Sequence, residues 1–188
     1  MTATATRRRR GRARGITAIE AAIGIALGGS VLAVAVPAFV RNLSFSRLGE
    51  ATNGLERIGT RAIAGADGKT CDEAFPPSAP LTPASVPRGK ATIDADPDPW
   101  EQPTWRALDF RPSPPGVAHW FSFAFDRAQA KGQSSFVAHA HGDLDGDGQT
   151  STFEVRGACE SPPSRGGANG NAGTSKLAPG MYVDREVE

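Results

Sequence analysis

Signatures of catalytic chemistry are missing from this sequence of 188 residues. It contains no C-x-x-C pair, no glycine-rich phosphate-binding loop and no arrangement of a nucleophile beside a base. No internal repeat is visible, and cysteine is scarce, with Cys71 and Cys159 as the only two. These absences predict that the protein is not an enzyme and that it requires no cofactor.

The N-terminus is the most distinctive part of the sequence. Six arginines lie within the first fourteen residues, and the stretch from Gly15 to Glu20 follows them. The next run, residues 21–40, is almost entirely apolar and long enough to cross the core of a bilayer. Glu20 is the one carboxylate near the start of that run. A charge inside a membrane costs roughly 2.5–3.5 kcal/mol on insertion scales, so we expect Glu20 to have an interaction partner and a functional role.

A basic leader ending in Gly15, a carboxylate at Glu20 and a proline at Pro37 resemble the N-terminus of the type IV pilin and pseudopilin family. The resemblance implies that prepilin peptidase cuts after Gly15 and that Ile16 is then N-methylated. Glu20 becomes the fifth residue of the mature chain, where the family's glutamate neutralises the N-terminal amine of a neighbouring subunit. Pro37 becomes the twenty-second residue, where a proline usually bends the helix. Isoleucine in first place departs from the family's usual phenylalanine.

The resemblance implies a structural subunit of a type IV pilus-like filament, assembled through its N-terminal helix as a homo-polymer or with other pilins. Its partners would be prepilin peptidase and the inner-membrane assembly machinery. The precursor would be held in the inner membrane, and the product would be a cell-surface pilus. The leader equally fits a pseudopilin of a type II secretion system, which would form a periplasmic pseudopilus.

A secretory signal is the alternative interpretation of the N-terminus. The arginines would form its basic region, and Ala33-Val34-Ala35 would be a small-residue cleavage site. The mature protein would then begin near Val36, as a secreted calcium-dependent binding module. That interpretation gives Gly15, Glu20 and Pro37 no role. A twin-arginine signal is also less suitable, because no apolar motif follows the arginine pairs directly.

The basic charge of the chain resides in the leader. Without its six arginines, fifteen Lys and Arg face twenty Asp and Glu, which gives a charge near −5 instead of +1. The sequence therefore gives no support for nucleic-acid binding. An even cysteine count in an exported chain predicts one disulfide, between Cys71 and Cys159. A disulfide late in the chain also resembles pilins.

The expected fold is α+β and pilin-like, with a long N-terminal helix whose distal half packs on an antiparallel sheet. The domains predicted are a cleaved leader (1–15), a transmembrane assembly helix (16–40), an amphipathic distal helix (41–66) and a β-rich head (67–188). We expect the helix to end at the turn residues 65–68 and Pro37 to kink it. Apolar residues spaced by three and four form one stripe that faces the sheet: Leu48, Ala51, Leu55, Ile58 and Ala62. Off that stripe, Arg47, Glu50, Glu56, Arg57 and Arg61 are expected to face solvent or a neighbour.

A proline-rich connection is predicted over residues 71–115, with short strands near 90–93 and 105–110 and with Trp100 and Trp105 as anchors. Alternating patterns then predict an antiparallel meander of strands at 117–125, 134–141 and 150–156. Residues 161–175 are rich in Pro, Gly, Ser and Asn and predict a flexible loop. A last short strand is expected at 181–183.

One motif predicts a metal site. Asp143, Asp145 and Asp147 with Ser151 and Glu154 fit D-x-D-x-D-G-x5-E, the spacing of a calcium-binding loop. The flanks look like strands, so Glu154 points away from the neighbouring core residues, which weakens its fit as a ligand. The alternative is a hairpin turn that favours Asp and Gly. Three histidines, His119, His139 and His141, offer a weaker zinc hypothesis, because no ligand spacing fixes their pairing.

Overall fold

The computed structural model describes residues 15–94, 98–161 and 173–184. The chain divides into two compact units, Met1–Asn42 and Leu43–Glu188. Helix α1 (Ala18–Gly65) contributes to both, and its beginning forms the described part of the first unit. The predicted leader lies outside the described residues except for Gly15. The helix ends at Gly65, where the turn residues predicted it.

The distal part of α1 packs on the sheet of the second unit. Every residue of the predicted apolar stripe is buried there: Leu48, Ala51, Leu55, Ile58 and Ala62. Two glycines allow the close approach, since a Cβ on Gly54 would lie 2.7 Å from the Phe123 ring and one on Gly59 3.0 Å from Leu177. The expected amphipathic stripe is therefore confirmed, and the fold is α+β.

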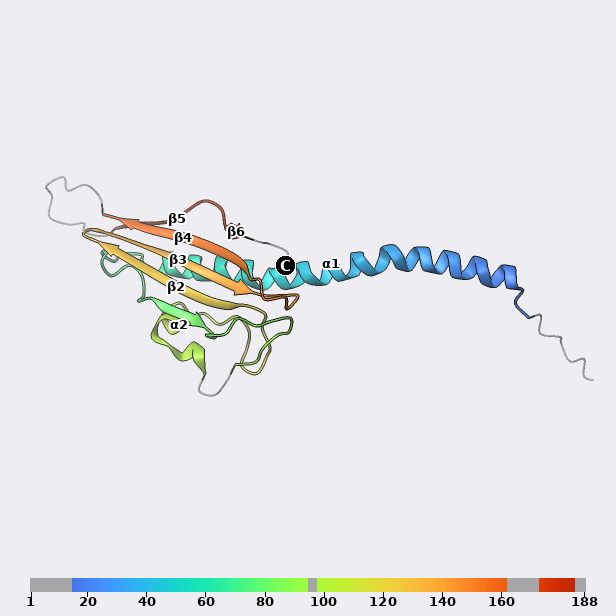
Figure 1. Cartoon of the computed structure of the whole chain (residues 1–188). Coiled ribbons are helices and arrows are strands. Elements are labelled where there is room, and N and C mark those ends of the chain that lie inside the picture. Colours follow the sequence, from blue (N-terminus) through green and yellow to red (C-terminus); the bar gives the residue numbers. More distant parts are fainter. Residues whose placement is uncertain (1–14, 95–97, 162–172, 185–188) are drawn as a thin grey trace, which may run out of the picture. The chain divides into compact units, whose positions relative to one another are not determined.

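Within the described residues, six strands form one antiparallel sheet: β1 (Ala79–Thr82), β2 (Ser122–Ala130), β3 (Gln133–Gly142), β4 (Ser151–Glu160), β5 (Thr174–Leu177) and β6 (Tyr182–Asp184). Their order is β1-β2-β3-β4-β5, and β6 also pairs with β4. Figure 1 shows β2, β3 and β4 side by side, with the distal part of α1 behind them. The meander that the alternating patterns predict is confirmed.

The face of the sheet toward α1 carries the core. Alternate residues point inward from each long strand, and their buried members are Phe123, Phe125, Phe136, Ala138, Ala140, Phe153 and Val155. Phe125 and Phe136 stack at 5.0 Å between ring centroids. Gly157 lies where a Cβ would come within 2.3 Å of Phe136, so the ring occupies the space of a side chain.

The proline-rich connection differs from its prediction. The expected strand at 105–110 is wrong, because the short helix α2 (Pro103–Ala107) occupies the start of that range. A 3-10 helix, η1 (Pro99–Glu101), precedes α2. Pro103 occupies the start of α2, where its missing N–H leaves no helical hydrogen bond unmade. Near residues 90–93 only one isolated bridge forms, between Thr92 and His119. Strand β1 was not expected.

Trp100 and Trp105 anchor the connection as predicted. Both are buried, and Trp105 donates its Nε1–H to Thr82 Oγ1 of β1 at 3.0 Å. The two rings lie 5.4 Å apart between centroids, and both contact Phe110. The connection is therefore an ordered part of the core.

The remaining strand boundaries shift by a few residues. Strand β2 begins at Ser122, later than predicted, and both β2 and β4 end several residues later than predicted. The predicted flexible loop at 161–175 is wrong at its end, since β5 begins at Thr174. Its centre, residues 162–172, lies outside the described residues.

The predicted disulfide is present. Cys71 and Cys159 are joined across a sequence separation of 88 residues, with 5.4 Å between their Cα atoms. The bond links the segment after α1 to the end of β4, and Gly173 lies over it so closely that a Cβ there would be 2.2 Å from Cys71 Sγ. The described chain contains no free cysteine.

Candidate functional site

The start of α1 places the predicted processing and assembly residues. Gly15 and Ile16 precede the helix, and Ile16 is exposed. Thr17 and Glu20 form a reciprocal cap: the Thr17 N–H and hydroxyl each donate to Glu20 Oε2 at 2.8 Å, and the Glu20 N–H donates to Thr17 Oγ1 at 3.3 Å. This is the S/T-x-x-E capping box, which satisfies donors that the first helical turn leaves open. It explains why α1 begins at Ala18 and not at Ile16.

The segment Ala18–Phe39 is long and apolar enough to cross a membrane. Its large apolar side chains are exposed: Ile19, Ile23, Ile25, Leu27, Val31, Leu32, Val34, Val36 and Phe39. Pro37 lies inside the helix. Contiguous exposed apolar surface of this extent marks an interaction with a membrane or another protein. An exposed apolar N-terminal helix is a property of membrane-anchored or exported proteins.

Small residues interrupt this segment. A Cβ added at Gly24, Gly28 or Gly29 would meet nothing within 4 Å. Each glycine weakens the helix by up to about 1 kcal/mol relative to alanine, and nothing in the described chain uses the space that it leaves. Small residues let helices approach one another closely in an apolar environment, so these positions fit contact with other helices.

The aspartate loop between β3 and β4 brings three predicted ligands together. One carboxylate oxygen of each of Asp143, Asp145 and Asp147 lies within 4.8 Å of the others. Asp143 is buried and accepts from the N–H groups of Gly146 at 2.7 Å and Gly148 at 3.0 Å. The φ angles of these glycines are 85° and 94°, a conformation that suits only glycine well. The loop is thus an ordered turn with converging carboxylates.

The other two predicted calcium ligands behave differently. Glu154 lies on β4 with Oε1 3.4 Å from His139 Nδ1 and Oε2 2.8 Å from Arg156 Nη2. Ser151 is buried, and its hydroxyl has no hydrogen-bond partner within the described structure. Neither residue belongs to the group that the three aspartates form. Whether calcium binds to those aspartates stays a prediction.

The three histidines lie in two different environments. His139 and His141 stack on β3 with 5.9 Å between ring centroids, on the face away from the core. Burial, reinforced by the charge of His139, lowers the pKa of His141, although Glu154 opposes this. His119 is buried beside Asp94. Among the described residues only the aspartates form a group of three or more metal-ligating side chains, so the histidines do not build the zinc site considered for them.

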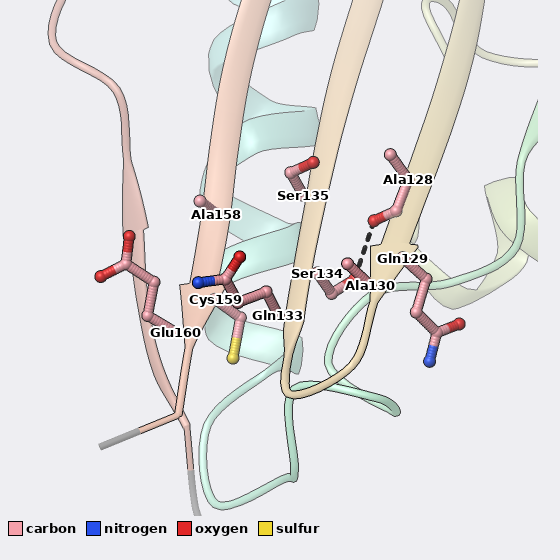
Figure 2. A pocket seen from close by; sticks show the side chains of 9 residues that line it. All are labelled: Ala128, Gln129, Ala130, Gln133, Ser134, Ser135, Ala158, Cys159 and Glu160. Carbon is pink, nitrogen blue, oxygen red and sulfur yellow. Dashed lines mark hydrogen bonds between the residues drawn. The ribbon is translucent and has the colours of Figure 1, made fainter. Parts of the chain in front are cut away.

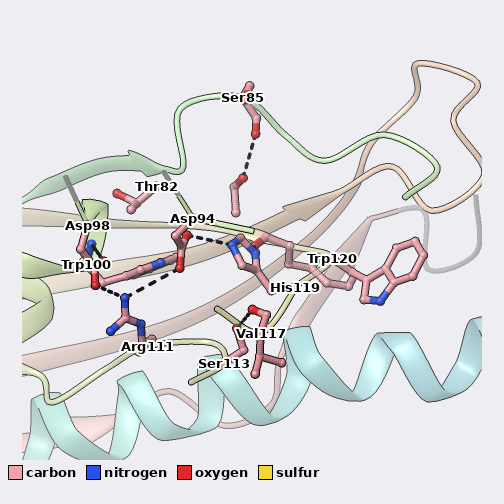
Figure 3. A network of polar contacts seen from close by, with 12 residues as sticks. Thr82, Ser85, Asp94, Asp98, Trp100, Arg111, Ser113, Val117, His119 and Trp120 are labelled. Carbon is pink, nitrogen blue, oxygen red and sulfur yellow. Dashed lines mark hydrogen bonds and ion pairs between the residues drawn. The ribbon is translucent and has the colours of Figure 1, made fainter. Parts of the chain in front are cut away.

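A partly buried polar network joins the connection to the sheet (Figure 3). His119 Nε2 lies 3.0 Å from Asp94 Oδ1, and its Nδ1 lies 2.9 Å from the Phe121 carbonyl oxygen. The Phe121 carbonyl oxygen can only accept, so His119 Nδ1 is the donor in that bond. Arg111 bonds Asp98 and lies 3.9 Å from Asp94. Burial tends to raise the pKa of Asp98, but the Trp100 N–H and Arg111 outweigh it and the pKa falls.

Glu50 of α1 extends this network, although the sequence placed it off the buried stripe. Its carboxylate accepts from the Trp120 N–H at 2.9 and 3.0 Å and from the Phe121 N–H at 3.0 Å. Burial raises the pKa of Glu50, while these N–H groups and His119 act in the opposite direction. No local signal identifies such a residue, since its partners lie 70 and 71 positions away.

A hollow lies at the end of the sheet where the β2–β3 hairpin turns. It measures about 190 Å³ and lies across the ends of β2, β3 and β4 (Figure 2). The Ser134 hydroxyl donates there to the Ala128 carbonyl at 3.5 Å, and Glu160 is the one carboxylate among the lining residues. A solitary carboxylate without a base or second acid beside it gives no arrangement for general acid–base catalysis.

Comparison with protein-family models, with curated proteins and with solved structures found no match. The class of the protein therefore follows from its own architecture. An exposed apolar helix, its distal continuation packed on an antiparallel sheet, and a disulfide within the head together form a pilin-like architecture. The particular role within that class is a matter for proposal.

Proposed function

We propose that the protein is a structural subunit of a type IV pilus-like filament. The observation that carries this is the exposed apolar segment Ala18–Phe39 with a single carboxylate, Glu20, which is the fifth residue after the Gly15–Ile16 junction. The resemblance of this N-terminus to type IV pilins supplies the processing step, in which prepilin peptidase cuts after Gly15 and Ile16 is N-methylated. The inner membrane holds the precursor, and assembly transfers the helix into the filament.

The physics of the exposed segment supports assembly through that helix. Side chains such as Leu32, 61% exposed, gain about 25 cal/mol for each Å² of apolar surface that leaves water. Lipid covers them in the precursor, and helices of other subunits cover them in a filament. Glu20 then needs an opposite charge in the same dry site, because an unpaired buried charge is strongly destabilising. The new N-terminal ammonium of a neighbouring subunit supplies that charge.

A pseudopilin of a type II secretion system is the second candidate, since the same N-terminus serves both. Cell-surface pili that disappear on deletion of the gene favour the pilin. A secretion defect without loss of pili favours the pseudopilin. Either product copolymerises with related subunits and depends on the inner-membrane assembly machinery.

The mass and N-terminal sequence of the mature protein test the proposal. Prepilin processing gives a chain that begins with methylated Ile16. A start near Val36 would instead identify a secretory signal, remove the helix and leave an exported β domain. Glu20→Gln should still be processed but should fail to assemble. The matched control is Glu56→Gln, which neutralises an exposed glutamate on the distal part of the same helix and should assemble normally.

Calcium at the loop of Asp143, Asp145 and Asp147 is a separate prediction. Three carboxylates this close repel one another, and a divalent cation would remove the repulsion and lock the hairpin. Titration calorimetry of the mature protein with calcium chloride measures the binding. The double substitution Asp145→Asn and Asp147→Asn should abolish it, whereas Glu154→Gln should leave it unchanged because Glu154 pairs with His139 and Arg156.

A further inference from the structure

The disulfide between Cys71 and Cys159 is closed off from solvent. Each of the two cysteines is only 1% exposed, although the bond lies where β4 ends. A disulfide is reduced or exchanged only when a thiolate reaches one of its sulfur atoms, so access limits the reaction. The parts of the chain that cover the two sulfur atoms therefore decide whether this bond is attacked in the folded head.

A short segment of the chain lies over the bond. It consists of residues 173–177, which are Gly173 and the four residues of β5, and we call it the β5 strap. A Cβ on Gly173 would overlap both Cys71 Sγ and Cys159 Sγ, so no side chain fits between this backbone and the two sulfur atoms. The Gly173 N–H donates to the Lys69 carbonyl at 3.0 Å, which fixes the start of the strap above the bond.

The β5 strap is held by few contacts. Within the described residues, β5 pairs only with β4, at the end of the strand order (Figure 1). Leu177, at the other end of the strap, is 36% exposed and lies over Gly59 of α1, where an added Cβ would be 3.0 Å from its Cδ2. Short segments with little buried apolar surface open locally at a low free energy, while the rest of the fold stays intact.

One group in the strap opposes its docking. Ser175 is paired with Cys159 in the sheet, and its hydroxyl is buried without a hydrogen-bond partner in the described structure. An unpaired buried hydroxyl has lost its hydrogen bonds to water and regains them when the segment opens. The β5 strap is therefore fitted closely over the disulfide but is weakly retained there.

The opposite side of Cys159 does not open its sulfur atom to solvent. Cys159 is among the residues that line the hollow of about 190 Å³ at the end of the sheet (Figure 2). It is nevertheless 1% exposed, so the hollow stops short of the sulfur atom while β4 keeps its place. Displacement of the strap uncovers both sulfur atoms without any movement of β4.

We propose that the β5 strap is a lid on the disulfide and that thiols reach the bond only after the strap has opened. Opening exposes the two sulfur atoms to a thiolate, while the distal part of α1 and strands β2, β3 and β4 keep their packing. A protein that exchanges thiols and disulfides therefore acts on this head before the strap docks or during such openings. The proposal concerns the head alone and does not depend on filament assembly.

Reduction by dithiothreitol under native conditions tests the proposal. One thiolate of the reagent attacks a sulfur atom, its second thiol closes the reagent into a cyclic disulfide, and the two electrons leave both cysteines as thiols. The full chain in detergent is quenched at intervals with iodoacetamide, and mass spectrometry measures the fraction in which both cysteines are alkylated. Gly173→Ala forces a methyl group against both sulfur atoms, so it should displace the strap and accelerate reduction roughly ten-fold or more.

Three further variants sharpen the test. Leu177→Ala loosens the other end of the strap without touching the sulfur atoms and should accelerate reduction roughly five-fold, even if Gly173→Ala fails to fold. Ser175→Ala removes the unpaired hydroxyl, favours docking of the strap and should slow reduction roughly five-fold. Gly54→Ala is the matched control, because it also adds one methyl group to a crowded glycine, but against Phe123 of β2. It should leave the rate of reduction unchanged.

Each outcome decides between routes to the bond. Faster reduction of the Gly173 and Leu177 variants, slower reduction of Ser175→Ala and an unchanged rate for Gly54→Ala are the expected results. Equal acceleration by Gly54→Ala and by the strap variants would mean that thiols reach the bond through unfolding of the whole head, and it would overturn the proposal. Strap variants that are reduced at the wild-type rate would also overturn it and would leave the hollow beside Cys159 as the route.

Discussion

The two parts of α1 carry the same kinds of side chain, but those of the first part are exposed and those of the distal stripe are buried. Leu32, in the first unit, is 61% exposed, whereas Leu55, in the second, is 0% exposed. Gly28 has open space where a Cβ would lie, whereas Gly54 would place that Cβ against Phe123. Both parts are helical, and both are apolar on at least one face. Helix formation alone therefore does not determine what covers the helix.

The difference separates folding from assembly. The distal part of α1 completes the core of the head, so its side chains are under the constraint of close packing within one molecule. The first part has no such partner among the described residues, and we propose that lipid or other subunits cover its apolar surface. Substitutions in the distal part should change the stability of the head, whereas equivalent substitutions in the first part should change membrane retention and assembly.

Loss of the disulfide should produce the largest effect on the head. Replacing both Cys71 and Cys159 by serine removes a link across 88 residues, which the chain-entropy model values at roughly 4–5 kcal/mol. Urea unfolding of the full chain in detergent measures the loss. Carbonate extraction of the precursor should be unchanged, because both cysteines lie in the second unit. A loss confined to membrane retention would contradict the separation of the two units.

A matched pair of leucines should give the next effect. Leu55→Ala opens a cavity in the core and should lower the free energy of unfolding by about 2–5 kcal/mol. Leu32→Ala removes an exposed side chain and should leave that value within about 0.5 kcal/mol of the wild type. Equal effects of the two substitutions in the same urea titration would mean that the head also depends on the first part of the helix.

A matched pair of glycines tests the same contrast by adding a methyl group. Gly54→Ala forces Cβ to within 2.7 Å of the Phe123 ring and should destabilise the head by about 1–3 kcal/mol. Gly28→Ala meets nothing within 4 Å and should leave head stability unaltered. If small residues serve helix contacts in the filament, Gly28→Ala should reduce the yield of sheared filaments. Normal filament yield from Gly28→Ala would remove that role.

The features that the sequence predicts well depend on local periodicity. Spacings of three and four in α1 and of two in β2, β3 and β4 identify the buried faces, because each element must turn its apolar side to the core. The pairing of Cys71 with Cys159 could be predicted from the number of cysteines alone, since two cysteines allow only one intramolecular disulfide. The aspartate loop was located by its spacing, although Glu154 could not be assigned without its partners on β3 and β4.

The features that the sequence does not predict depend on distant contacts. The sequence predicted a short strand at 105–110, yet Trp105 is fixed by Thr82, which lies 23 positions away, and α2 forms there. Glu50 looks like a solvent-facing helical residue until Trp120 and Phe121 supply its hydrogen bonds. Processing at Gly15 and pairing at Glu20 involve other molecules, so the fold of one chain leaves them as predictions.

Glu50 provides the smallest and most specific test of the distal part of α1. Burial raises its pKa above the ordinary 4.5, because the N–H groups of Trp120 and Phe121 and the charge of His119 only partly offset the desolvation of the carboxylate. A carboxyl whose folded pKa is raised stabilises the protein below its unfolded pKa, and this contribution is lost as the pH rises through the folded value.

Glu50→Gln has no such titration and keeps the neighbouring His119 and Asp94. The stability of the wild type relative to Glu50→Gln should therefore fall as the pH rises from 4.5 toward neutrality in urea titrations at several pH values. A difference that stays constant would show that the two N–H groups and His119 balance burial. A difference that grows with pH would show that they outweigh burial and that Glu50 acts as a stabilising anion at this junction of helix and sheet.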